Sequence, residues 1–255
     1  MTDAPRIFTP DYYERMRRLE GGSWWNAGMR DIAAMLLQDT SLPDRGTLLD
    51  VGCGSGQTMT WFETRHRNWR TIGFDVADEG LRAARASGGR VFHASALTIP
   101  LASHSVDLAI TLDVLQHLPL DGGDLQALRE MHRVLRPGGL LFVRTNAQAF
   151  PVTEPDPAFQ FRKYTVPELT RQLTAAGFSV RRLSRVNAVL GLAEIPRELR
   201  ARREGPGYHG LLAQPRRDPD WVFRAKRQWL RWEGALVRLG VPLPFGRTIL
   251  ALCTA

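Results

Sequence analysis

The chain has 255 residues, of which 44% are hydrophobic and 24% charged, and its formal net charge is +8. This length predicts one α/β domain with its own core, and no apolar stretch approaches the roughly 18 residues that cross a membrane. The two cysteines, Cys53 and Cys253, indicate neither a disulfide framework nor a cysteine-rich zinc site. The start of the chain lacks a basic, then apolar leader, which favours a cytoplasmic protein without a membrane partner.

The positive charge is unevenly distributed along the chain. Residues 1–150 carry a net charge of −1, whereas residues 151–255 carry +9. One interpretation is a surface for an anionic partner. The other, which we favour, is a preference for arginine as the cation, since lysine occurs only at Lys163 and Lys226. No nucleic-acid-binding aromatic motif accompanies the charge, so we do not expect nucleic acid as a partner.

The chain begins with a helical segment over residues 1–45, which includes a helix from about 28 to 38. Strands are then predicted near residues 47–52, 70–75, 90–94, 106–112 and 139–145, with helices between them. This alternation indicates a parallel sheet with helices on both faces. A helix over 166–176 and a strand over 178–183 follow. We divide the single domain into a lid segment at 1–45, a core at 46–186, a helical insert at 187–244 and a closing strand at 245–255.

The insert contains a predicted helix over residues 219–239. Apolar side chains recur along it near one helical face: Trp221, Ala225, Trp229, Trp232, Leu236 and Leu239. We expect this face to be buried. It either packs on the core or forms a hydrophobic wall of a substrate site over which the insert lies.

Three alternating glycines, Gly52, Gly54 and Gly56, follow the apolar run that ends the first strand. Glycines at this spacing suit a tight strand-to-helix turn whose backbone approaches a ligand closely, although such turns also occur where nothing binds. Gln57 stands where a dinucleotide fingerprint needs its third glycine, and no Walker motif follows. Asp75 ends the next strand, where a carboxylate accepts ribose hydroxyls or, alternatively, caps the helix over 79–86.

These motifs resemble the class I S-adenosylmethionine-dependent methyltransferases of type 11, in their small-molecule group. The resemblance covers most of the chain, and its segments occur in the family's order: Asp50–Gly56, Gly73–Asp75, Pro100–Leu108, Leu115–Leu118, Glu130–Gly139 and Tyr164–Phe178. It implies a doubly wound, Rossmann-like sheet of seven strands, mostly parallel with an antiparallel last strand.

The resemblance also implies a binding site for S-adenosylmethionine. The glycine turn borders the methionine part, Asp50 supports the turn, and Asp75 holds the ribose. The implied cofactor positions are Asp50, Gly52, Cys53, Gly54, Gly56, Asp75, Val76, Ser95, Ala96 and Leu112. Ser95 stands where relatives commonly have an acidic residue for the adenine amino group, and its hydroxyl accepts the same bond without charge assistance.

Candidates for the acceptor side are fewer. By resemblance, Tyr12, Tyr13, Trp24 and Arg30 belong to a lid over the cofactor, with core packing as the alternative for the tryptophan. Tyr164 is a candidate for lining the acceptor site. His117 follows the fourth strand at the ligand-binding edge, where a neutral imidazole accepts a proton near pH 7; the alternative is a structural histidine. Methyl transfer from this cofactor requires no metal.

Two classes of function are compatible with these motifs. The first is a methyltransferase acting on a small metabolite or natural-product acceptor, with RNA or a carrier-bound substrate as the alternative acceptor. The second is a non-catalytic scaffold with the same fold. The intact glycine turn and Asp75 favour the enzyme, while the acceptor and the oligomeric state stay open.

Overall fold

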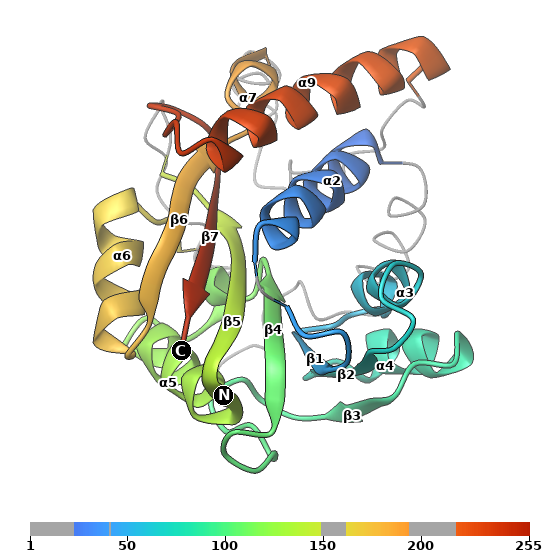
Figure 1. Ribbon diagram of the computed structural model, residues 1–255, viewed down its shortest axis with the longest axis vertical. Coiled ribbons are helices and arrows are strands. Elements are labelled where there is room, and N and C mark those ends of the chain that lie inside the picture. Colours follow the sequence, from blue (N-terminus) through green and yellow to red (C-terminus); the bar gives the residue numbers. More distant parts are fainter. Residues whose placement is uncertain (1–22, 41, 149–161, 194–217) are drawn as a thin grey trace, which may run out of the picture.

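The computed structural model describes residues 23–40, 42–148, 162–193 and 218–255. Within them, seven strands form one sheet in the order β3-β2-β1-β4-β5-β7-β6 (Figure 1). Their bounds are Thr47–Val51 (β1), Arg70–Asp75 (β2), Val91–His93 (β3), Val106–Leu112 (β4), Leu135–Asn146 (β5), Ser179–Val186 (β6) and Thr248–Thr254 (β7). Strands β1 to β5 run parallel, and β7 is antiparallel to both β5 and β6. The predicted fold class is confirmed.

The helices connect these strands and cover both faces of the sheet. They are α2 (Trp24–Gln38), α3 (Gln57–Glu63), α4 (Asp78–Ala86), α5 (Gly123–Val134), α6 (Val166–Ala175), α7 (Val189–Ala193) and α9 (Asp220–Arg238), with a 3-10 turn, η2, at Leu115–His117. None of the helices in the described part of the chain combines the length and apolarity needed to cross a membrane.

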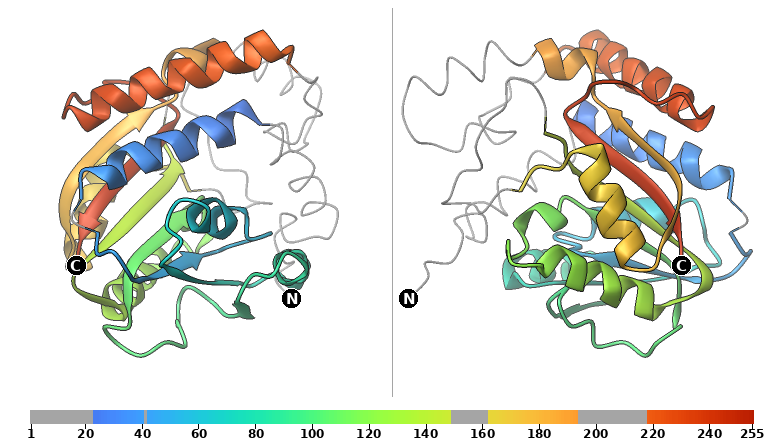
Figure 2. Two further views of the ribbon diagram at one scale, coloured as in Figure 1. Left: turned by 45° about the vertical axis from the view of Figure 1, so that its right-hand side comes forward. Right: turned by 90° about the vertical axis from the view of Figure 1, so that its left-hand side faces the viewer.

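Two hydrophobic layers sandwich the sheet. On one face, α2 and α9 pack over β4, β5 and β7, and Ile32, Leu230 and Phe142 belong to one buried cluster. On the other face lie α5 and α6 (Figure 2), whose Leu128 and Leu173 belong to a separate buried cluster. Because successive strand residues point to opposite faces, each central strand contributes to both layers.

Helix α2 begins earlier than predicted from the sequence. The hydroxyl of Ser23 accepts a hydrogen bond from the N–H of Asn26 at 3.2 Å, so the helix starts at Trp24 rather than near residue 28. A serine before a helix is a recognised start signal. The prediction missed it because the two tryptophans obscured the helical periodicity.

The prediction of which face of α9 is buried was wrong. The buried residues are Leu230, Glu233, Gly234 and Val237, whereas Trp221 is 70% and Trp232 is 58% exposed. Both faces of this helix carry apolar side chains, so periodicity alone did not identify the one that contacts the core. Gly234 lies on the packed face, where a Cβ would come within 2.7 Å of the Ile32 side chain.

The order of the strands reverses at β1. This strand pairs with β2 on one side and with β4 on the other, so the chain adds strands first to one side of β1 and then to the other. Open α/β sheets bind ligands beyond the carboxyl ends of their strands at such a reversal. The glycine turn after β1 lies at this position, so a ligand is expected beside it.

Candidate functional site

The glycine turn after β1 depends on backbone conformations that favour glycine. Gly52, Gly54 and Gly56 have φ angles of +73°, +49° and +79°. The N–H groups of Gly52 and Cys53 both donate to the carbonyl of Phe74, at 2.9 Å each. The turn is thus attached to the end of β2 and leads directly into α3.

Asp75 holds this turn through its side chain. Its Oδ2 accepts the N–H of Gly54 at 2.9 Å, and its Oδ1 accepts the N–H of Ala77 at 3.0 Å. Helix α4 begins after Ala77, so Asp75 is not its N-cap residue. A carboxylate has about four acceptor positions, and these two bonds are compatible with further bonds to ribose hydroxyls.

The turn has a packed side and an open side. A Cβ built on Gly52 would collide with Cγ2 of Val114, so the segment between β4 and the η2 turn closes that side. Around a Cβ built on Gly54, no heavy atom of the described residues lies within 4 Å. As far as the described residues go, the backbone at Gly54 therefore borders open space, which fits the approach of the methionine part of the expected cofactor.

The other expected cofactor residues surround the same edge of the sheet. Asp50 is buried on β1, and Leu112 is half-buried at the end of β4. Cys53 is buried too, and burial, followed by the nearby carboxylates of Asp50 and Asp75, raises the pKa of its thiol. A thiol held in its protonated form is not a nucleophile, so Cys53 acts here as a small apolar residue.

The expected adenosine end lies after β2 and β3. Val76 is 44% exposed, and its carbonyl oxygen lies 2.9 Å from Nε2 of His93. The hydroxyl oxygen of Ser95 accepts the N–H of Leu97 at 3.2 Å, while Ala96 is buried. A hydroxyl oxygen has two lone pairs, so this bond is compatible with a second one from an adenine amino group.

His117 ends the η2 turn that follows β4. Its backbone N–H donates to the carbonyl of Val114 at 2.9 Å; the residue is half-buried, and its Nδ1 atom is buried. Next to it, the side-chain oxygen of Gln116 accepts the N–H of Asn146 at 3.0 Å and the hydroxyl of Thr145 at 3.2 Å. These bonds tie the η2 turn to the end of β5 and fix where His117 lies.

Tyr164 lies beneath the η2 turn and is 2% exposed. Its hydroxyl donates to Asp124 Oδ2 at 3.0 Å, and Arg162 forms an ion pair with the same buried carboxylate. Burial, with the adjacent Asp124 carboxylate, raises the pKa of Tyr164. The arrangement supports the η2 turn from below, because Arg162 also donates to the carbonyls of Gln116 and Pro119.

One group at this edge was not anticipated from the sequence. Asp113, directly after β4, has a φ of +59°, which is uncommon for a residue with a side chain. Arg144 Nη2 lies 2.5 Å from Asp113 Oδ2, and its guanidinium carbon lies 4.4 Å from the ring centroid of Trp25. The sequence signal for this group was Arg144, which directly follows the apolar run 140–143 of β5.

The lid candidates are only partly described. Tyr12 and Tyr13 lie outside the described residues. Trp24 is half-buried at the start of α2, with Nζ of Lys226 at 5.2 Å from its ring centroid. Arg30 is half-buried on the same helix. The lid role of these residues stays a prediction.

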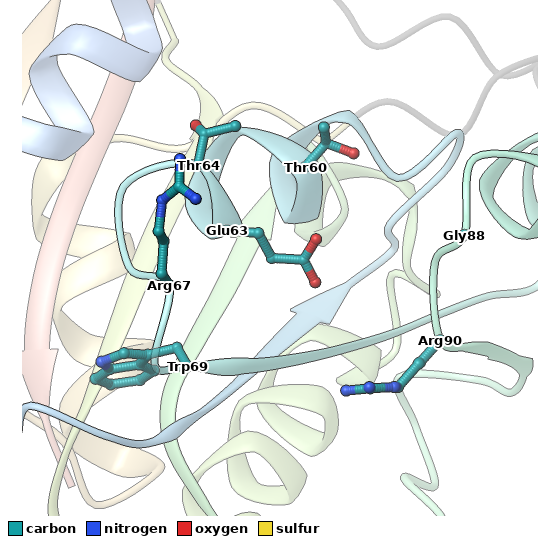
Figure 3. Close-up of a pocket in the computed structure, with 7 residues that line it drawn as sticks. All are labelled: Thr60, Glu63, Thr64, Arg67, Trp69, Gly88 and Arg90. Carbon is teal, nitrogen blue, oxygen red and sulfur yellow. The ribbon is translucent and has the colours of Figure 1, made fainter.

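A separate surface hollow lies at the opposite edge of the sheet (Figure 3). Its volume is about 610 Å³, and its lining residues are Thr60, Glu63, Thr64, Arg67, Trp69, Gly88 and Arg90. Trp69 precedes β2 and Arg90 precedes β3, so the hollow borders the amino ends of these strands. The predicted cofactor residues lie at the carboxyl ends.

The strand order, the glycine turn and the acidic end of β2 together define the class I fold of S-adenosylmethionine-dependent methyltransferases. Residues 49–143 match the family model described as a methyltransferase domain. The chain therefore contains a methyltransferase domain of type 11, and the predicted family is confirmed.

Similar proteins agree with this family. A Mycolicibacterium smegmatis protein described as a probable S-adenosylmethionine-dependent methyltransferase is 34% identical over 153 residues, which are 58% of each chain. An Arabidopsis thaliana tRNA (carboxymethyluridine(34)-5-O)-methyltransferase is 30% identical over 112 residues, 44% of this chain and 26% of the relative. This chain thus spans only part of the length of both relatives.

A solved structure shows the same fold over nearly the whole chain. It is the complex of the Haloferax volcanii Trm112 methyltransferase activator with a methyltransferase. Its TM-score is 0.62 at 17% identity, and the match covers 99% of this chain and 97% of that chain. At this identity the likeness concerns the fold.

Proposed function

We propose that this protein transfers a methyl group from S-adenosylmethionine to a small-molecule acceptor. The observation that carries the proposal is the bond from Gly54 to Asp75 beside the open side of the glycine turn. It brings an acidic strand end and an accessible backbone together at the reversal of the strand order. That combination suits a ligand with both a ribose and an amino-acid part.

Each part of the site has a role in holding the cofactor. The glycine turn approaches the methionine part, with Asp50 beneath it, and Asp75 accepts the ribose hydroxyls through charge-assisted bonds. Ser95 accepts a bond from the adenine amino group, while Val76 and Ala96 border the base. These roles rest on the positions of the residues around one edge of the sheet.

The acceptor side lies at the carboxyl ends of β4 and β5. When bound, S-adenosylmethionine supplies a methyl group that is already activated by its sulfonium. The protein's task is to hold the acceptor in line at about 3 to 3.5 Å and to remove a proton where the nucleophile carries one. We assign proton removal to His117 and contact with the acceptor to Trp25 and the pair of Asp113 and Arg144.

A small acceptor is favoured over RNA because several basic residues form ion pairs within the protein. Arg162, Arg227 and Arg238 all come from the basic second half of the chain, and each pairs with a carboxylate, of Asp124, Asp31 and Asp39 respectively. Paired arginines contribute less to a continuous surface for phosphates. The relation to the Arabidopsis tRNA methyltransferase keeps RNA as the alternative.

The first experiment is calorimetric titration of the protein with S-adenosylmethionine and S-adenosylhomocysteine. We expect saturable binding of both. No binding at about 1 mM ligand, the weak end of specific affinities, would contradict the proposal and favour a scaffold. A screen of small acceptors and bulk tRNA, which measures S-adenosylhomocysteine production, then identifies the acceptor class. Methylation of RNA should in addition fall steeply as the salt concentration rises, whereas methylation of a small acceptor should not.

A further inference from the structure

Helix α9 carries a large apolar face that points away from the protein. We define the tryptophan face of α9 by five side chains, with exposed fractions of 37% to 77%: Trp221, Trp229, Trp232, Leu236 and Leu239. Val241 and Phe245, both exposed, continue it beyond the end of the helix. Clusters of this kind on a folded surface mark an interaction site.

The tryptophan face is exposed because the opposite side of α9 is firmly packed. A Cβ on Gly28 of α2 would lie 2.5 Å from the Leu230 side chain, which shows how closely the two helices approach. Arg227 also forms two bonds to Asp31 of α2, at 2.7 and 2.9 Å. Packing and ion pairs therefore fix which side of α9 faces outward, and α9 is the outermost element beside α2 (Figures 1 and 2).

Positive charge borders the tryptophan face. Arg224, Arg227 and Arg231 lie along one side of it over two helical turns. Two carboxylates face these three arginines, so this side keeps one positive charge: Asp220 lies one turn before Arg224, and Asp31 of α2 lies 2.7 Å from Arg227 and 4.0 Å from Arg231. Glu233, the other acidic residue of α9, is 5% exposed and accepts the N–H groups of Asn187 and Ala188.

We propose that the tryptophan face of α9 docks on the surface of an anionic lipid bilayer. Indole rings have an apolar body and a polar N–H, which suits the boundary between headgroups and acyl chains, and arginines bind the lipid phosphates. The proposal revises the expectation of no membrane partner and is independent of the proposed methyl transfer.

The test is sedimentation of the full chain with vesicles of phosphatidylglycerol or phosphatidylcholine. We expect saturable binding to phosphatidylglycerol, with a blue shift of tryptophan fluorescence, and binding to phosphatidylcholine that is about tenfold weaker or more. The double variant Trp221→Ser/Trp232→Ser should bind phosphatidylglycerol at least about tenfold more weakly than the parent protein. Leu120→Ser removes another side chain that is 65% exposed, away from α9, and should bind like the parent protein.

Three results would overturn the proposal. They are the absence of binding to phosphatidylglycerol, equal binding of the double variant, and equal binding to both lipids. Sedimentation velocity separates one further case: a dimer that the double variant dissociates, without vesicle binding, would make this face an interface between two copies. Both tryptophans are exposed, so unfolding curves of the double variant should match those of the parent.

Discussion

The carboxylate of Asp75 accepts the backbone N–H of Gly54, which joins the end of β2 to the turn after β1. One side chain therefore shapes the turn and faces the expected ribose. Replacing it with alanine should weaken S-adenosylhomocysteine binding by about 1.5 to 3 kcal/mol, the range for charge-assisted hydrogen bonds, or roughly 10- to 150-fold in Kd. Calorimetry measures this change directly.

Asp78→Ala is the matched control for this variant. It removes the same charge from an exposed residue three positions along the chain, in the first turn of α4. We expect its cofactor affinity to equal that of the parent protein. An Asp75→Ala protein that binds as tightly as the Asp78→Ala protein would remove Asp75 from the ribose site.

Alanine variants of Gly54 and Gly88 distinguish the effect of backbone strain from the effect of blocking the ligand. Both have a positive φ, +49° and +83°, and neither has a heavy atom of the described residues within 4 Å of a built Cβ. Replacing either with alanine should therefore cost a similar stability of about 1 to 2 kcal/mol in urea unfolding. Only Gly54→Ala should also lower cofactor affinity, by about tenfold or more, because its methyl group enters the proposed ligand space.

Equal cofactor affinities of the two glycine variants would show that the space at Gly54 is not occupied by ligand. Gly52→Ala does not serve this purpose. Its Cβ would collide with Val114, so a loss of binding there would not be separable from damage to the fold.

The sequence was most informative where one signal repeats locally. Strands β2 and β4 begin and end at the predicted residues, and the glycine turn lies at the sheet edge where a ligand is expected. Contacts between distant segments left no local signal. Arg144 and Asp113 meet only because β4 and β5 pair in parallel, and the packed face of α9 depends on Gly28 of α2. Periodicity shows that a helix has an apolar face but not which face finds a partner.

His117→Ala tests the proposed base once an acceptor is identified. A general base contributes about a hundredfold or more, so turnover should fall by that factor while the cofactor Kd stays unchanged. A variant with the parent turnover would leave His117 a structural residue of the η2 turn.

Removing the Tyr164 hydroxyl tests how the η2 turn is supported. It donates to the buried Asp124 carboxylate at 3.0 Å, and its removal leaves this charge with one donor fewer. Tyr164→Phe should therefore lower the free energy of unfolding by about 1 to 3 kcal/mol, seen as a lower urea midpoint at an unchanged m value. Ser105→Ala deletes an exposed hydroxyl that donates to the Ala102 carbonyl at 2.7 Å, and should cost little. If the two variants unfold at the same midpoint, Arg162 and the N–H of Leu125 hold the Asp124 carboxylate without help from the Tyr164 hydroxyl.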